Sequence, residues 1–99
     1  MLNTFNVKSK IFEYPGMGAW HFIAVPKKES VKIKQTFGGM KRGFGSLRVI
    51  VKVGQTKWKT SIFPDSQSGT YFLPIKSEVR KKEKLKKGDE IKFSVEILL

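Results

Sequence analysis

The amino-acid sequence predicts a mostly β protein: a single domain, residues 1–99, folded as a small closed or nearly closed β-barrel with one or two short helices. A length of 99 residues suits one domain. Apolar and polar residues alternate in several short stretches, which is the period of half-buried strands. Five or more such strands would leave open edges in a flat sheet, and closing the sheet into a barrel removes those edges.

The first two strands are expected near the N-terminus. Over residues 5–11, apolar side chains alternate with asparagine and lysine, as in a strand with one buried face. A turn is expected at residues 14–18, which contain a Pro-Gly pair. The stretch 20–25 is apolar on both faces, which is typical of a central strand, and it ends before Pro26.

The middle of the chain predicts a β-hairpin. Apolar residues alternate over 47–53, the inward face continues over 56–62 with Thr56, Trp58, Thr60 and Ile62, and a two-residue turn that begins at Gly54 separates the two stretches. Glycine supplies the positive φ that such turns require at the first central position. This turn places Val51 opposite Trp58 and gathers every large apolar side chain except Ile50 and Phe63 on one side of the hairpin.

Two proline-led segments, residues 26–37 and 74–85, resemble each other. Each follows an apolar strand, carries a valine five residues after the proline, ends in a large apolar residue, and precedes glycine and another strand. For the second segment that strand is 91–97, whose odd positions are apolar. We predict that both prolines start short helices at equivalent places on the barrel, while a true pseudo-two-fold repeat stays open because proline is common at helix starts.

The predicted core takes large apolar residues from each of these strands. They are Phe5, Val7, Trp20, Phe22, Leu47, Val49, Val51, Trp58, Ile62, Phe93 and Val95.

Composition excludes several classes of site. The chain has no cysteine and one histidine, which removes disulfide scaffolds, thiol catalysis, zinc fingers and iron–sulfur clusters, and we expect no metal and no cofactor. It has no apolar run of about 18 residues that could span a membrane, and its N-terminus lacks the features of a signal peptide. We therefore expect a cytoplasmic protein.

The charge balance points to an anionic partner. Twenty basic and eight acidic side chains give a net charge of +12. The hairpin places four cations on its outer face, where they could contact the phosphates of a nucleic acid or the charges of another polyanion. The predicted anion-binding residues are these four, Arg48, Lys52, Lys57 and Lys59, with Lys41 and Arg42 from the loop that precedes the hairpin and Arg80 from the second helical segment. The alternative is a solvated barrel face, where lysine protects against edge-to-edge aggregation, because no row of exposed aromatic residues is expected beside the charges.

Other constellations are weaker. The glycine-rich stretch 38–45 could bind a small anion, but it lacks the Lys-Ser/Thr pair of a phosphate-binding loop and is followed by a strand, so it also fits a flexible connection. An enzyme built around His21 would need an orienting carboxylate and a nucleophile, which the sequence does not indicate. We expect no enzymatic activity. The alternative function is a small-ligand barrel with a pocket lined by Trp20, His21, Trp58 and Tyr71.

Four segments carry a family resemblance: WHFIAVP at 20–26, GFGSLRV at 43–49, TSIFPD at 60–65, and YFLPIK at 71–76, which leads to VRK at 79–81 and GD at 88–89. Together they resemble the bacterial domain-of-unknown-function family numbered nineteen hundred and five. The resemblance implies a small closed β-barrel and assigns no activity.

The C-terminal third is also similar to swapped-hairpin regulators of the AbrB type. The similarity consists of a strand that ends at Pro74, then residues 79–81 and 85–89, then another strand. Those regulators are dimeric DNA-binding barrels built from two copies of such a unit. If one chain holds both halves, the resemblance implies a monomer, and it serves as a fold analogy only.

Overall fold

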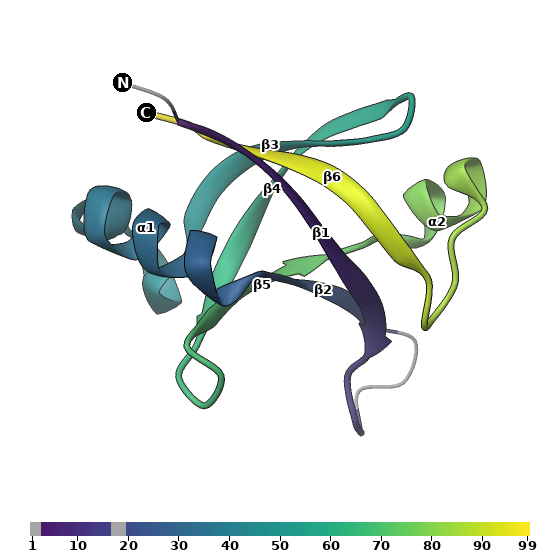
Figure 1. The fold of residues 1–99 in the computed structure, drawn as a ribbon, viewed down its shortest axis with the longest axis horizontal. Coiled ribbons are helices and arrows are strands. Elements are labelled where there is room, and N and C mark those ends of the chain that lie inside the picture. Colours follow the sequence, from purple (N-terminus) through teal and green to yellow (C-terminus); the bar gives the residue numbers. More distant parts are fainter. Residues whose placement is uncertain (1–2, 17–19) are drawn as a thin grey trace.

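The computed structural model describes residues 3–16 and 20–99 as a closed antiparallel β-barrel with two α-helices (Figure 1). In chain order the elements are β1 (Thr4–Glu13), β2 (His21–Val25), α1 (Lys27–Phe37), the short 3-10 helices η1 (Gly38–Met40) and η2 (Gly43–Gly45), β3 (Leu47–Val53), β4 (Thr56–Asp65), β5 (Thr70–Pro74), α2 (Ser77–Glu83) and β6 (Glu90–Ile97). The strand order around the barrel is β1-β2-β5-β4-β3-β6. The prediction of a mostly β, closed barrel is confirmed.

Strands β1 and β4 close the barrel because each pairs with two neighbours along its ten residues. The first part of β1 pairs with β6 and its last part with β2. Likewise, the first part of β4 pairs with β3 and its last part with β5. The elements β1-β2-α1-β3 therefore repeat as β4-β5-α2-β6, and exchanging these halves leaves the strand order of the barrel unchanged.

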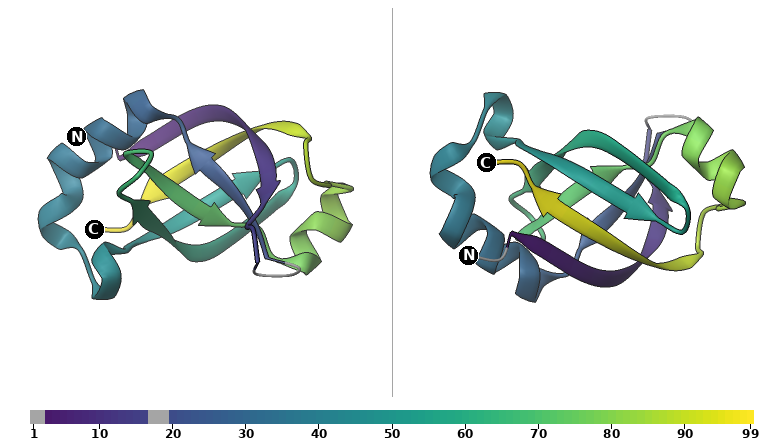
Figure 2. Two further views of the ribbon diagram at one scale, coloured as in Figure 1. Left: turned by 90° about the horizontal axis from the view of Figure 1, so that it is seen from below. Right: turned by 90° about the horizontal axis from the view of Figure 1, so that it is seen from above.

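The helices lie at opposite ends of the barrel (Figures 1 and 2). Helix α1 begins directly after Pro26, as predicted. The prediction was wrong for Pro74, which is the last residue of β5, pairs with Phe22, and precedes the start of α2 by three residues. The next residue, Ile75, donates its N–H to the carbonyl of His21. Because successive backbone N–H groups point to opposite sides of a strand, the backbone nitrogen of Pro74 points away from β2. On that side β5 no longer pairs with β4 at this position. Proline therefore costs no ladder hydrogen bond there.

The inward side chains of the strands form the core inside the barrel. The two helices cover the ends of the barrel. Strands β3 and β6 contribute their odd-numbered residues, which are all buried, as expected from their alternation. At one end α1 adds Ile33 and Phe37, and Phe37 packs edge-to-face against Phe5 with ring centroids 6.5 Å apart. At the other end α2 adds Val79.

Two of the predicted core residues lie outside the barrel. Trp20 is 54% exposed, and Phe22 is only half-buried. The reason is the alternation of side chains along a strand, since Ile23 and Val25 of β2 already take the inward direction. Phe5 and Trp58 are half-buried against the core, and the other predicted core residues are buried.

The turn predicted at 14–18 is only partly visible. Pro15 and Gly16 form a turn, and residues 17 and 18 lie outside the described residues.

Candidate anion-binding face

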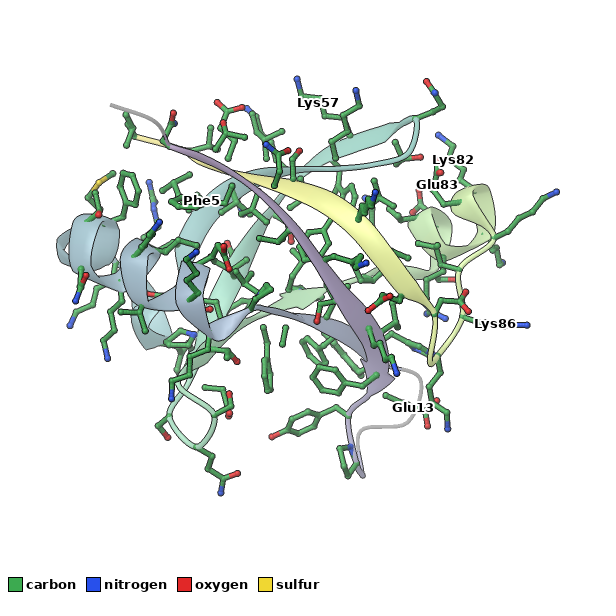
Figure 3. All side chains as sticks on the ribbon, in the orientation of Figure 1. Phe5, Glu13, Lys57, Lys82, Glu83 and Lys86 are labelled. Carbon is green, nitrogen blue, oxygen red and sulfur yellow. The ribbon has the colours of Figure 1, made fainter. Side chains whose placement is uncertain are left out.

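The predicted hairpin register is confirmed, and it sets the outer face of β3 and β4. Gly54 has a φ of +56°, and the strands pair Val51 with Trp58. The side chains that point away from the core are then the even positions of β3 and the odd positions of β4. The four predicted cations of the hairpin, Arg48, Lys52, Lys57 and Lys59, are all exposed there. Figure 3 shows Lys57 directed outward from β4.

These four cations lie at two places on the hairpin. Lys52 stands directly opposite Lys57, near the turn. Arg48 and Lys59 lie toward the other end of the hairpin, where they line a hollow of about 250 Å³ together with Arg42. Arg48 is held in this region by a 3.1 Å hydrogen bond that its Nη1 donates to the hydroxyl of Ser61.

Strands β6 and β1 continue the basic face beyond the hairpin. Lys92 of β6 stands directly opposite Lys8 of β1. An open groove of about 480 Å³ runs among these side chains. This lysine groove is lined by Asn6, Val7, Lys8, Lys52, Gly54, Lys92, Phe93 and Ser94, and Lys57 stands beside it as the cross-strand partner of Lys52.

Positive charge in the lysine groove is weakly balanced. The register places like charges opposite each other twice, and such cross-strand pairs are destabilising. Lys8 has an acidic neighbour, with its Nζ 3.8 Å from Oε1 of Glu90, but both side chains are about half exposed. Ion pairs in such settings contribute little free energy. Lys52 has Ser94 as its neighbour on β6, and that hydroxyl adds a neutral hydrogen-bonding group to the groove.

Sequence reasoning missed Lys8 and Lys92. Alternation along each strand does show that both side chains point outward, since Val7 and Phe93 beside them are buried. What it lacks is the pairing of β1 with β6, because these strands come from opposite ends of the chain.

The other predicted anion-binding residues lie elsewhere. Arg80 is on α2, where its Nε donates a 3.2 Å hydrogen bond to the carbonyl of Ile75. Lys41 lines a hollow at the α1 end of the barrel, with Lys34 and the glycines that follow α1. Neither residue lines the lysine groove, so the structure does not unite all seven predicted cations in one site.

The four residues of the alternative pocket are also dispersed. Trp20 and His21 line a hollow of about 260 Å³ together with Arg80. Tyr71 is buried at the α1 end, where burial raises the pKa of its phenol, and Trp58 packs against the core. These four residues therefore do not line one cavity.

His21 has a carboxylate nearby. Oε2 of Glu13 is 3.8 Å from Nε2 of His21, and the two residues are cross-strand partners in β1 and β2. That separation is longer than a hydrogen bond. Glu13 and His21 form an ion pair when the imidazole is protonated.

Sequence reasoning also missed a group of aromatic side chains away from the hairpin cations. Five rings gather on the outer side of β1, β2 and β5 and in the residues beside them. We call this the aromatic face; it comprises Phe12, Tyr14, Trp20, Phe22 and Phe72. The even positions of β1 hold the missed signal, because they continue past two lysines to Phe12 and Tyr14.

Comparison with known proteins identifies the family. Residues 8–95 match the family model described as a domain of unknown function, DUF1905. The chain belongs to this family. The resemblance seen in the sequence is thus confirmed, and the matched range of the DUF1905 domain includes Lys8, Lys52, Lys57 and Lys92. No curated protein matches the chain.

Within residues 3–16 and 20–99 of this DUF1905 domain, no group of three or more histidine or acidic side chains is placed to hold a metal ion. Among the same residues, no helix is long and apolar enough to cross a membrane.

Proposed function

We propose that this protein is a non-enzymatic binding module for nucleic acid, and that the lysine groove contacts the phosphate backbone. The observation that carries the proposal is the pair of opposed lysines: Lys8 against Lys92, and Lys52 against Lys57. Lys8, Lys52 and Lys92 line one groove, and Lys57 stands beside it on the next strand. A polyanion bound there would relieve their mutual repulsion and release counterions, which is the main source of sequence-independent affinity for nucleic acid.

The strand pairing weakens the alternative explanation for Lys52. Lysine on an edge strand protects a sheet against pairing with another molecule. Lys52 is paired on both sides, with Lys57 of β4 and Ser94 of β6, so it has no open edge to protect. Lys8, Lys57 and Lys92 are each paired on one side. Solubility alone also does not explain why the lysines stand opposite one another, since dispersed lysines would give the same net charge without the repulsion.

The remaining cations suit a supporting role. Arg42, Arg48 and Lys59 line the hollow at the far end of the hairpin, where they extend the basic surface along β3 and β4. A long anion that follows the barrel surface from the lysine groove would meet these side chains next. A small anion would not reach both places, which favours a polymer as the partner.

The test compares two variants that lose the same charge from different places. One variant replaces Lys8, Lys52, Lys57 and Lys92 with glutamine. The control replaces four other exposed lysines with glutamine: Lys28, Lys32, Lys82 and Lys87, which lie on the helices or close to them. Binding of a fluorescein-labelled 20-base oligonucleotide, as single strand and as duplex, is measured by anisotropy at about 0.1 M salt.

At that salt concentration each lost phosphate contact should weaken binding by roughly five- to eightfold. We therefore expect the lysine-groove variant to lose on the order of 100-fold or more in affinity, and the control to lose much less. Equal losses in both variants would show that only net charge matters. That result, or no binding by the parent protein at low salt, would contradict the proposal.

A nucleic-acid partner also agrees with the expected cytoplasmic location, which stays a prediction.

A further inference from the structure

The aromatic face lies outside the barrel and is partly exposed to solvent, because Tyr14 and Trp20 are exposed while Phe12, Phe22 and Phe72 are half-buried. Its rings contact one another with centroid separations of 5.1 Å for Phe12 and Phe72 and 6.1 Å for Phe12 and Phe22. Trp20 lies nearly parallel to Phe22, at an interplanar angle of 17°. Trp20 is 54% exposed and Tyr14 is 39% exposed. Clustered exposed rings of this kind mark an interaction surface, because single exposed apolar residues need no partner but a contiguous patch does.

Cations flank the aromatic face on two sides. Along the outer side of β1, Lys8 and Lys10 are followed by Phe12 and then Tyr14. Successive side chains on one face of a strand are about 7 Å apart, so this strand leads from the lysine groove directly onto the rings. On the other side, Trp20 shares its hollow with residues of the segment that enters α2, among them Lys76 and Arg80.

We propose that the aromatic face is a stacking surface for the unpaired bases of single-stranded nucleic acid. The inference rests on the proposed function, because the phosphates of the same strand would follow β1 into the lysine groove. Bases in a duplex already stack on one another and are hidden from a flat protein surface. Unpaired bases expose their ring faces, and stacking them on protein aromatics is independent of base identity.

A second copy of this chain is the less suitable occupant. Two aromatic faces in contact would bring Lys10, Lys76 and Arg80 of both copies to the same interface. Each copy carries a net charge of +12, so their association is opposed by repulsion that a nucleic acid would instead neutralise.

The test separates stacking from charge. Trp20→Ala removes the most exposed ring of the aromatic face, and Phe44→Ala removes a ring that is 94% exposed on η2 as the matched control. The probes are a labelled 20-base oligothymidylate and a labelled 20-base-pair duplex. We expect Trp20→Ala to weaken binding of the single strand by roughly 5- to 150-fold, the range for loss of one stacked base, and to leave duplex binding within about twofold. Phe44→Ala should change neither.

A spectroscopic readout reports on the ring itself. In a Trp58→Phe variant, Trp20 is the one remaining tryptophan of the chain. Stacking on thymine should quench its fluorescence on addition of the oligothymidylate, whereas the duplex should quench it little. Equal quenching by both probes would contradict the inference.

The two proposals fail in different ways. If the glutamine variant of the lysine groove loses affinity for both probes while Trp20→Ala changes neither, the proposed function stands and the stacking surface is refuted. If the parent protein binds neither probe at low salt, both are refuted. Concentration-dependent dimerisation that Trp20→Ala abolishes, seen by sedimentation velocity without nucleic acid, would assign the face to a second copy and would also overturn the inference.

Discussion

Replacing Gly54 by alanine should destabilise the protein through two effects at the tip of the β3–β4 hairpin. Gly54 has a φ of +56°, in the left-handed region that side chains with a Cβ atom avoid. A Cβ atom added there would also overlap the carboxylate of Glu83. That carboxylate accepts a 2.6 Å hydrogen bond from the hydroxyl of Thr56 and so ties α2 to the hairpin. Figure 3 shows Glu83 on α2, beneath the hairpin tip.

The expected loss is the sum of these two effects. A left-handed conformation costs an L-residue about 1–2 kcal/mol. Moving Glu83 aside breaks its hydrogen bond to Thr56, and a hydrogen bond to a charged group contributes about 1.5–3 kcal/mol, with the lower end appropriate to a partly exposed pair. Gly54→Ala should therefore lower the free energy of unfolding by about 2–4 kcal/mol. For a domain of this size, each kcal/mol lowers Tm by roughly 4–8 °C.

A double-mutant cycle separates the two effects. Glu83→Ala alone removes the hydrogen bond to Thr56, and in its background Gly54→Ala should cost only the backbone term. Urea denaturation of the four proteins, followed by circular dichroism, should give a coupling free energy of about 1–2 kcal/mol between the two substitutions. Additive losses, within about 0.5 kcal/mol, would refute the contact between Glu83 and the turn.

Three further predictions concern the core and its aromatic residues. The buried hydroxyl of Ser30 donates to the carbonyl of Val25 at 2.8 Å and accepts from the N–H of Tyr71 at 3.1 Å. Ser30→Ala should therefore lower the free energy of unfolding, measured by urea denaturation, by about 2 kcal/mol or more. A loss under about 0.5 kcal/mol would contradict this bridging role. Burial raises the pKa of Tyr71, so the folded state favours the neutral phenol, and its contribution to stability, complete below about pH 10, is lost as the pH rises through the raised pKa. Tyr71→Phe should lack this loss, and stability curves that stay parallel to those of the parent above pH 10 would disagree. Trp58→Ala should cost about 3 kcal/mol and Trp20→Ala about 1 kcal/mol or less, since only the first ring packs on the core; equal costs would contradict the assigned burial.

Local sequence patterns predict the parts of this fold that local physics determines. The hairpin register follows from a two-residue turn at Gly54 and from alternation on both sides of it, and so the exposure of Lys52 and Lys57 follows as well. The inward residues of β6 follow from alternation alone. Closure of the barrel follows from the number of strands and the cost of leaving their edges open.

Contacts between distant segments were not predictable in this way. Lys8 and Lys92 become neighbours only when β1 pairs with β6, and no periodicity within either strand encodes that pairing. The prediction that Trp20 and Phe22 point into the core was wrong for another reason. Strand β2 is apolar on both faces, so alternation gave no preference, and general hydrophobicity favoured the larger rings for the core although Ile23 and Val25 occupy it.

The salt dependence of binding tests the central claim most directly. The logarithm of the affinity for the 20-base single strand is plotted against the logarithm of the salt concentration, for the parent and for the variant with glutamine at Lys8, Lys52, Lys57 and Lys92. Each phosphate contact contributes about 0.7 to the slope on single strands and about 0.9 on duplex DNA. We predict that the variant's slope is flatter by roughly 3 units, while the helix-surface control at Lys28, Lys32, Lys82 and Lys87 keeps the parent slope. Parallel lines for the parent and the lysine-groove variant would contradict the account.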